Sequence, residues 1–353
     1  MRPRRPARSA GASFAPFPGP VTVERLQNGL TVAVLASPQA PIVTSALWYR
    51  VGTRDEPLGQ GGIAHFLEHM MFKGSARYGP GEVDRRTQRL GGDNNAFTSH
   101  DATAYHFSFA TETWREALAI ESDRMRGLRL DPAEVESERR VILEEISMYE
   151  DEPWDALSVR VEAALYGPHP YGKPVLGTRE ELLATGPAEL AAFHDRFYRP
   201  ENAILVVGGD VGEPAAVVAA VAEAFGDWPV PPATAADRPD VPARVSPSGE
   251  LRLTRHKGEV ARLLWALPCP DTHDLGDPAL RLLVSALGGG RSSRLVRQLV
   301  DEEQLCAWAT ADHSEMIDPG MVAISAELVP GVSPEKVESR VREILAQAIT
   351  EPP

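Results

Sequence analysis

The sequence has little of three features that would place it in other classes of protein: cysteine, excess basic charge and long apolar runs. Its 353 residues include only Cys269 and Cys306, too few for a disulfide framework. The 36 Lys and Arg against 50 Asp and Glu give a formal net charge of −14, which argues against nucleic acid and anionic membranes as partners. No apolar run reaches the ~18 residues of a membrane-spanning helix. The remaining composition is typical of a globular protein with packed cores.

The N-terminus also lacks the apolar segment of a secretory signal peptide. Residues 1–20 begin with several arginines and continue with Ala, Gly, Pro and Ser, and we expect them to form a disordered, basic and proline-rich tail. With few cysteines and no recognisable signal, the default location is cytoplasmic.

The rest of the chain divides into two parts. Residues 229–248 are dense in Pro, Ala and Asp and predict a linker between a first domain over 21–228 and a second domain over 249–353. In the first domain we expect a hairpin at Asn28-Gly29 within 21–34, strands over 42–51, 95–109 and 203–207, and helices over 63–72, 113–128, 131–149 and 187–197. In the second we expect strands near Leu251 and over 261–267 and 321–328, and helices over 278–287, 292–299 and 334–349. This mixed order predicts an α+β fold.

The most informative segment is His65-Phe66-Leu67-Glu68-His69, inside the helix expected over 63–72 and ending near Gly74, a candidate C-terminal glycine. Histidines four residues apart project from one helical face, as two imidazoles must to bind one tetrahedral Zn²⁺. Glu68 lies on the same face and can take a proton from a bound water. The alternative is an amphipathic helix with two chance histidines. The H-x-x-E-H order, which occurs in metallopeptidases, favours the metal site.

A catalytic zinc site needs a third protein ligand and leaves its fourth position to water. The helix over 131–149, with Asp131 as N-cap and a capping-box Glu134, carries several glutamates that can supply this ligand. They are Glu134, Glu136, Glu138, Glu144 and Glu145. Glu138 and Glu145 are two turns apart and share a face. The alternative is a solvated face with ion pairs, which we expect for most of these charges, so the residues alone leave the third ligand open.

The segment from His65 to Gly74 resembles the active-site helix of the inverzincin metallopeptidases, peptidase family M16, which includes pitrilysin, insulin-degrading enzyme and mitochondrial processing peptidase. Gly91-Gly92 and Asn95-Ala96-Phe97-Thr98 resemble the edge strand of that family, and residues 138–146 resemble its second helix. The resemblance covers roughly residues 21–350, is most specific in the first half, and is to the short M16B-like subunits.

The resemblance implies an α+β fold of two homologous LuxS/MPP-like domains, derived from a ferredoxin-like arrangement, with the second one truncated. It also implies one Zn²⁺ ion bound by His65, His69 and Glu145. The glutamate follows the second histidine by 76 residues, the spacing that the resembled family shows.

The remaining roles are likewise implied by the resemblance. Glu68 and Glu138 would be the catalytic carboxylates, Glu68 as general base and later proton donor to the leaving amine, Glu138 as a support for the ligand geometry. Asn95 and Ala96 would bind the backbone of an extended peptide. The alternative for Asn95 is a turn residue after Gly91-Gly92.

Two departures from the family bear on activity. Self-sufficient members carry an Arg and a Tyr seven residues apart in the second domain, where this sequence has Val300 and Ala307. We therefore expect a homologous partner subunit, in a heterodimer, to supply these groups, or else a homodimer. The sequence also stops early for this family at Pro353, and we expect the second domain to be incomplete.

The expected function is that of a zinc-dependent endopeptidase acting on peptides or unfolded segments, as the catalytic subunit of a two-subunit assembly. One alternative is a non-catalytic core or scaffold subunit of the same fold, against which the intact pentad and Glu145 speak. Another is a small-molecule lyase with the same pentad and a cysteine ligand, but neither Cys269 nor Cys306 is near the pentad in sequence. The sequence leaves Mn²⁺ or Co²⁺ open in place of Zn²⁺.

Overall fold

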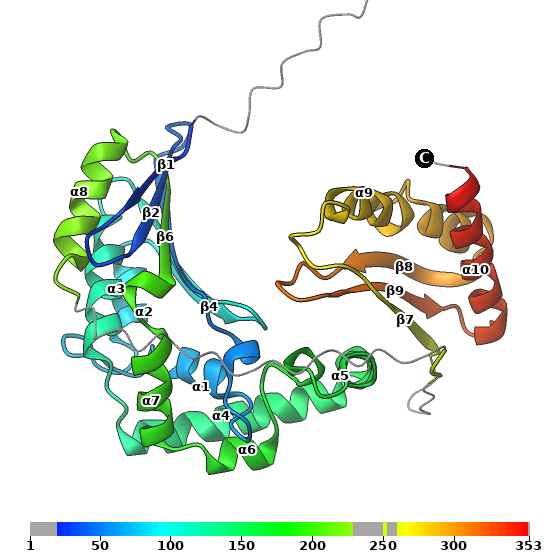
Figure 1. Cartoon of the computed structure of the whole chain (residues 1–353), viewed down its shortest axis with the longest axis horizontal. Helices are drawn as coiled ribbons and strands as arrows, with labels where there is room; N and C mark the ends of the chain where they lie inside the picture. Colours follow the sequence, from blue (N-terminus) through cyan, green and yellow to red (C-terminus); the bar gives the residue numbers. More distant parts are fainter. Residues whose placement is uncertain (1–19, 229–249, 253–259, 352–353) are drawn as a thin grey trace, which may run out of the picture.

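The fold consists of two sheets, each with its own helices (Figure 1). The structure is a computed structural model that describes residues 20–228, 250–252 and 260–351. The predicted linker over 229–248 and all but the last residue of the predicted N-terminal tail lie outside the described residues. The mixed α+β architecture expected from the sequence is confirmed.

The first sheet has the strand order β1-β2-β6-β3-β5-β4. Its strands are β1 (Thr22–Arg25), β2 (Thr31–Ala36), β3 (Ile42–Tyr49), β4 (Asp93–Thr98), β5 (Thr103–Ala110) and β6 (Ala203–Gly209). Neighbouring strands are antiparallel, except that β2 and β6 are parallel. The hairpin predicted at Asn28-Gly29 joins β1 and β2, and the predicted stretch over 95–109 is resolved into β4 and β5. In β3, Val43 and Leu47 are buried whereas Ile42 and Trp48 are exposed, so only one face of this sheet is packed.

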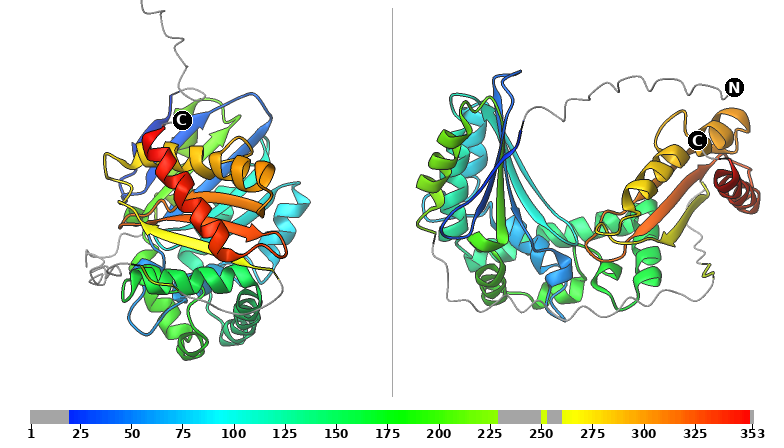
Figure 2. Two further views of the ribbon diagram at one scale, coloured as in Figure 1. Left: turned by 90° about the vertical axis from the view of Figure 1, so that its right-hand side faces the viewer. Right: turned by 45° about the horizontal axis from the view of Figure 1, so that its top comes forward.

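Helices cover the packed face of this sheet and continue below it. They are α1 (Ile63–Met70), α2 (Glu82–Arg89), α3 (Arg115–Gly127), α4 (Pro132–Asp151), α5 (Pro153–Tyr166), α6 (Arg179–Ala184), α7 (Pro187–Phe197) and α8 (Pro214–Phe225), with the 3-10 turns η1 (Thr53–Asp55), η2 (Pro170–Gly172) and η3 (Pro200–Asn202). Helix α1 contacts α4, α7, β4 and β5 and so lies at the centre of this half. The uncovered face of the sheet is turned toward the second half of the chain (Figures 1 and 2).

The second half is smaller and has a separate hydrophobic core. It contains β7 (Arg262–Pro268), β8 (Cys306–His313) and β9 (Met321–Leu328) in the antiparallel order β7-β9-β8, together with α9 (Asp277–Gly288), the π-helix η4 (Val296–Glu302) and α10 (Pro334–Thr350). Leu295, Leu299 and Ile324 are buried at the centre of its core. Among the described residues, no helix combines the length and the apolar character needed to cross a bilayer.

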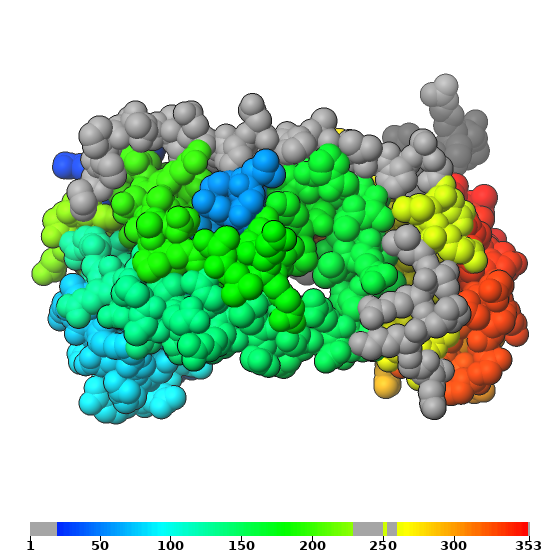
Figure 3. All heavy atoms as spheres, turned by 90° about the horizontal axis from the view of Figure 1, so that it is seen from below, coloured from blue at the N-terminus to red at the C-terminus, as the bar shows by residue number. Residues whose placement is uncertain are grey.

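The two halves meet along α5 and at the loop between β8 and β9. Trp154 of α5 packs against Trp308 of β8 with ring centroids 4.9 Å apart, and Tyr166, Tyr171 and Met321 share a small apolar cluster. Seen from below, residues of the first half coloured green lie between its cyan residues and the yellow to orange-red second half (Figure 3).

Several local predictions were wrong or incomplete. The zinc-helix candidate ends at Met70 with Met71 as C-cap, so Gly74 is not its C-terminal glycine. The helix expected over 292–299 is instead the π-helix Val296–Glu302, and the described residues around Leu251 are not in a strand. Helices α2, α5, α6 and α8 and strand β8 were not predicted. In α2 only Val83 and Thr87 are buried, too few to give a helical apolar period.

The half-buried ring of His100 predicts that the stability of the first half depends on pH. This imidazole lies 2.6 Å from the hydroxyl of Thr53 and packs on Tyr171, and burial, which outweighs the nearby Asp101 carboxylate, lowers its pKa to about 4. Unfolded histidine titrates near pH ~6.5, so the unfolded state binds more protons as the pH falls from about 6.5 to 4, and stability is lost over that range. Between pH 7 and pH 5, we expect the free energy of unfolding to fall by about 2 kcal/mol less in His100→Gln than in the unmodified protein. Urea unfolding at the two pH values measures this difference.

The matched control is His106→Gln, which changes a half-buried histidine elsewhere on the same strand pair. This variant should keep the pH dependence of the unmodified protein. If His100→Gln lowered stability equally at pH 7 and pH 5, burial of His100 would not be the cause of the pH dependence.

Candidate metal centre

Helix α1 is fixed in rotation by its apolar side chains. Ile63, Phe66 and Leu67 are fully buried in the main core. Because these residues occupy the core-facing side, Glu68 and His69 remain half-buried at the opening toward α4 and β4. The hydrophobic effect thus sets the direction in which the polar side chains of the pentad point.

The first turn of α1 is capped from the preceding loop. The carboxylate of Glu56 accepts the N–H groups of Gly62 and Ala64, each at 3.0 Å, and so satisfies donors that a helix start leaves unpaired. Gly62 has φ +84°, and a Cβ there would lie 2.3 Å from the carbonyl oxygen of Leu176. Only glycine fits this approach.

Helix α4 supplies the facing carboxylates. The helix starts as predicted, with Asp131 as N-cap and Pro132 in the first turn. The side chain of Asp131 accepts the N–H of Ala133 at 2.8 Å. The reciprocal contact from Glu134 that a capping box needs is not among the hydrogen bonds of the described helix. A helix placed this way turns Glu138 and Glu145, two turns apart, toward α1.

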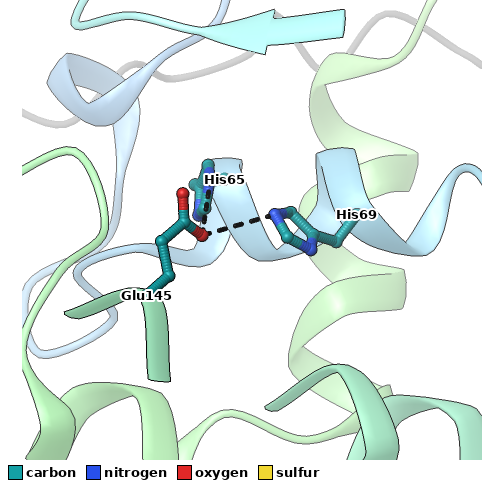
Figure 4. Close-up of side chains that lie close together, drawn as sticks. All are labelled: His65, His69 and Glu145. Carbon is teal, nitrogen blue, oxygen red and sulfur yellow. Dashed lines mark ion pairs between the residues drawn. The ribbon is translucent and has the colours of Figure 1, made fainter. Parts of the chain in front are cut away.

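His65, His69 and Glu145 converge at the junction of α1 and α4 (Figure 4). One carboxylate oxygen of Glu145 lies 3.8 Å from Nε2 of His65 and 3.7 Å from Nε2 of His69. One ligand atom from each residue lies within 4.8 Å of the other two, and this is the candidate metal-binding group among the described residues. The structure therefore brings together the three residues that were expected to bind zinc.

The donor set fits a catalytic zinc ion. Tetrahedral zinc with bonds of about 2.0–2.1 Å holds neighbouring ligand atoms about 3.3–3.5 Å apart. The separations of 3.8 and 3.7 Å between the Glu145 oxygen and the two imidazoles are close to this spacing. Two histidines and one carboxylate leave a fourth position for water. Burial, aided by the nearby His69, lowers the pKa of His65 to about 3, so this imidazole is neutral and able to ligate a metal.

Behind His69 lies a chain of polar contacts. Nδ1 of His69 donates to Glu138 at 3.1 Å, and Nζ of Lys73 lies 2.6 Å from the other oxygen of that carboxylate. Burial alone would raise the pKa of Glu138, but its bonds to His69 and Lys73 outweigh burial and lower the pKa. A charged Glu138 fixes the imidazole so that Nε2 faces Glu145.

Glu68 lies on the other side of the histidine pair and is held by β4. Its carboxylate accepts the hydroxyl of Thr98 at 2.6 Å. Burial raises the pKa of Glu68, against the opposing effect of the Thr98 hydrogen bond. A carboxyl group with a raised pKa is suited to exchanging protons near neutral pH.

Asn95 and Ala96 lie within β4, the outermost strand of the first sheet, and not in a turn. The Asn95 side chain accepts the N–H of Ala96 at 2.9 Å. Beyond β4 no further strand pairs among the described residues, so its outer edge has the free backbone groups to which an extended peptide can add.

Sequence reasoning missed Lys73 and Thr98. Lys73 lies in the turn after α1, beyond its end at Met70, so helical spacing could not have placed it beside Glu138. Thr98 is two residues after Ala96, so strand alternation turns both toward α1. As expected, Glu136 is exposed and forms ion pairs with Arg139 and Arg140. Arg139, however, is buried and not on a solvated face, because its guanidinium also donates to backbone carbonyl oxygens of residues 182 and 185.

The second half has apolar residues at the two positions where self-sufficient members of the resembled family carry an Arg and a Tyr. Val300 lies in η4 against the core, and Ala307 is an exposed residue of β8. Both cysteines are buried in the core of the second half, remote in fold from the α1–α4 junction, so a sulfur ligand finds no support.

Comparisons with known proteins agree with this arrangement. A family model described as "Insulinase (Peptidase family M16)" matches residues 31–179, and one described as "Peptidase M16 inactive domain" matches residues 186–353. The chain is 32% identical to an "Uncharacterized zinc protease" of Mycobacterium leprae over 93% of this chain and 72% of the relative, and 31% identical to one of Bacillus subtilis over 84% and 71%. A protease from Helicobacter pylori of known structure superimposes with a TM-score of 0.81 at 25% identity, over 94% of this chain and 79% of that one.

The contact between Glu138 and His69 predicts a measurable effect on metal affinity. We expect Glu138→Gln to weaken zinc binding by about 10–100-fold, because the neutral amide no longer fixes the His69 imidazole. Competition with a chromogenic chelator measures the affinity. Glu144→Gln, which changes an exposed glutamate on the same helix, is the control and should bind zinc normally. Equal affinities for both variants would show that Glu138 does not support the site.

Proposed function

The chain belongs to peptidase family M16, and on that premise we propose that it is a zinc-dependent endopeptidase that hydrolyses peptides or unfolded segments. The observation that carries this proposal is the convergence of His65, His69 and Glu145 from two helices, with Glu68 beside them. The names of the relatives as zinc proteases support the choice of metal.

In this proposal, a bound zinc ion would supply an acidified water and polarise the scissile carbonyl. The chain's residues carry the remaining work. His65, His69 and Glu145 hold the ion, and Glu68 takes the proton from the attacking water and later gives it to the leaving amine. Thr98 keeps the Glu68 carboxylate turned toward that water, because its hydroxyl occupies one of the two carboxylate oxygens.

The substrate backbone is proposed to add to the free edge of β4. Main-chain hydrogen bonds from a strand recognise an extended peptide without regard to most side chains, which fits a preference for unfolded segments. Asn95 and Ala96 are on this strand, and Thr98 at its end contacts Glu68. A peptide paired with β4 would therefore run past the metal ligands.

We further propose that a homologous partner subunit completes the site. Val300 and Ala307 cannot donate hydrogen bonds from their side chains to an oxyanion, and the loss of one such donor costs about 2.7–4 kcal/mol of transition-state stabilisation. The same observation favours a second candidate function, a scaffold subunit that retains the fold without useful activity. The intact set of ligands and Glu68 argues for the enzyme.

The general-base role of Glu68 predicts a selective loss of activity. We expect Glu68→Gln to lower kcat by at least about 10²-fold, because an amide cannot take a proton from water, while zinc content measured by atomic absorption stays normal. Glu144→Gln on α4 should leave kcat unchanged. Retention of cleavage by Glu68→Gln, or cleavage that survives removal of the metal by a chelator, would rule out the proposed mechanism.

The partner proposal predicts that the isolated chain cleaves peptides slowly. Addition of a homologous chain that lacks H-x-x-E-H but carries Arg and Tyr seven residues apart should raise kcat by about 10²-fold or more, since it restores oxyanion donors. A fluorogenic peptide assay of the chain, the partner and their mixture tests this. Full activity of the chain alone, unchanged by the partner, would contradict the heterodimer. A zinc-loaded mixture with no activity would favour the scaffold.

A further inference from the structure

One loop of the second half reaches the loops that support the catalytic carboxylate and the start of α1. Residues 314–320 connect β8 to β9, and we call this segment the brace loop. Its tip lies at the base of the first half, near the end of β4 and the helices coloured green (Figures 1 and 2). The brace loop contacts the first half through hydrogen bonds and ion pairs, and through Met316, which packs on the cluster that contains Tyr166 and Tyr171.

Asp318 makes the central contacts of the brace loop. Its carboxylate accepts Nε–H of Arg54 at 2.5 Å and lies 3.4 Å from Nε2 of His169. Its backbone N–H donates to the hydroxyl of Tyr171 at 3.1 Å. The Arg54 and Asp318 side chains are only 15% and 25% exposed, so this charged hydrogen bond is weakened less by water than a surface pair would be.

Asp101 receives the second set of contacts. One carboxylate oxygen accepts the hydroxyl of Tyr171 at 2.6 Å, and the other accepts the backbone N–H of Ile317 at 2.9 Å. The Tyr171 ring is fully buried, so its hydroxyl is held between Asp101 of the first half and Asp318 of the second. Two chain segments far apart in the sequence are thereby joined through one oxygen atom.

Both segments of the first half that meet the brace loop lead directly to the site. Thr98, which holds Glu68, is three residues before Asp101. Arg54 is two residues before Glu56, which caps α1. The two segments are also bonded to each other, since the N–H groups of residues 53 and 54 donate to the carbonyl oxygens of residues 99 and 100 at 3.2 and 2.9 Å.

This approach is so close that it requires glycine at one position. A Cβ on Gly52 would lie 2.3 Å from the carbonyl oxygen of Ser99. The two loops therefore form one tightly packed unit, and a displacement of either is transmitted to the other. The brace loop contacts both of them.

We propose that the brace loop positions the active site: Asp318, Tyr171, Asp101 and Arg54 hold the loops that orient Glu68 and the first turn of α1. The second half, which lies within residues 186–353 matched by the model described as "Peptidase M16 inactive domain", thus contributes to the site without supplying a catalytic residue. The inference rests on the proposed function only for the role of Glu68 as general base. The contacts between the brace loop and the two loops of the first half do not depend on that function.

The test compares two substitutions in the brace loop of the zinc-loaded full chain by hydrogen–deuterium exchange. Asp318→Asn weakens the charged contact with Arg54. Glu315→Gln is the control, because Glu315 is in the same loop but pairs with Arg281 of its own half at 2.5 Å. We expect Asp318→Asn to speed exchange about tenfold in residues 53–56, 62–66 and 96–102, and Glu315→Gln to leave those residues unchanged.

The result that would overturn the proposal is faster exchange confined to residues 169–173 and 314–320. The contact would then only join the halves, without reaching the site. Should Asp318→Asn fail to fold, Tyr171→Phe is the replacement variant, because it removes the bridging oxygen and keeps the buried ring. Its exchange rates in the same segments then test the proposal. Because exchange needs no substrate, this experiment gives its answer even if the chain cleaves no peptide, a failure that would count against the proposed function alone.

Where cleavage is measurable, kinetics add a second readout. Asp318→Asn should lower kcat about tenfold with little change in KM, because Glu68 is less well oriented. In a Thr98→Val background the same substitution should have almost no further effect, since the contact through which it acts is already lost. Independent, multiplicative losses from the two substitutions would contradict transmission through Thr98.

Discussion

The packing of α1 against the core and α4 is the constraint on which the candidate site depends. Five apolar side chains of this short helix are buried, which fixes its rotation about its axis. In that setting both imidazoles face α4, where Glu145 approaches them from below. A helix of eight residues is too short to be stable alone, so its geometry comes from the surrounding core, and the polar chemistry is a consequence of apolar packing.

Charged groups at the edge of a core lose hydration, which costs free energy. In this site, hydrogen-bonding or ion-pairing partners and a neutral imidazole reduce that cost. Glu138 is almost fully buried, yet it is stabilised by Lys73 and His69. His65 avoids the cost by remaining neutral, which is the form a metal needs. Burial raises the pKa of Glu68, and the hydrogen bond from the Thr98 hydroxyl only partly offsets this effect. Neighbouring carboxylates thus acquire different proton affinities from different partners.

The sequence alone predicted those features of the fold that depend on the pattern of neighbouring residues. The pentad predicted a helix with two facing histidines, and the Asp131-Pro132 pair predicted the start of α4. Alternation predicted most strands, whereas the polar helix α2 and strand β8 gave too weak a period. The choice of Glu145 over its neighbours, and the roles of Thr98 and Lys73, depend on how distant elements pack. The residues alone left Glu145 as one of several candidates, and only the resemblance to a family singled it out.

In our proposal, the second half affects the chemistry of the site without supplying a reactive group. Its core is separate, and the positions at which self-sufficient members of the family carry an Arg and a Tyr hold Val300 and Ala307. Yet its loop over 314–320 makes charged and backbone hydrogen bonds to the first half. Preorganised hydrogen-bond donors and acceptors act best when the surrounding structure holds them still. The proposed support of Glu68 by the loop over 314–320 is therefore independent of the residues at positions 300 and 307.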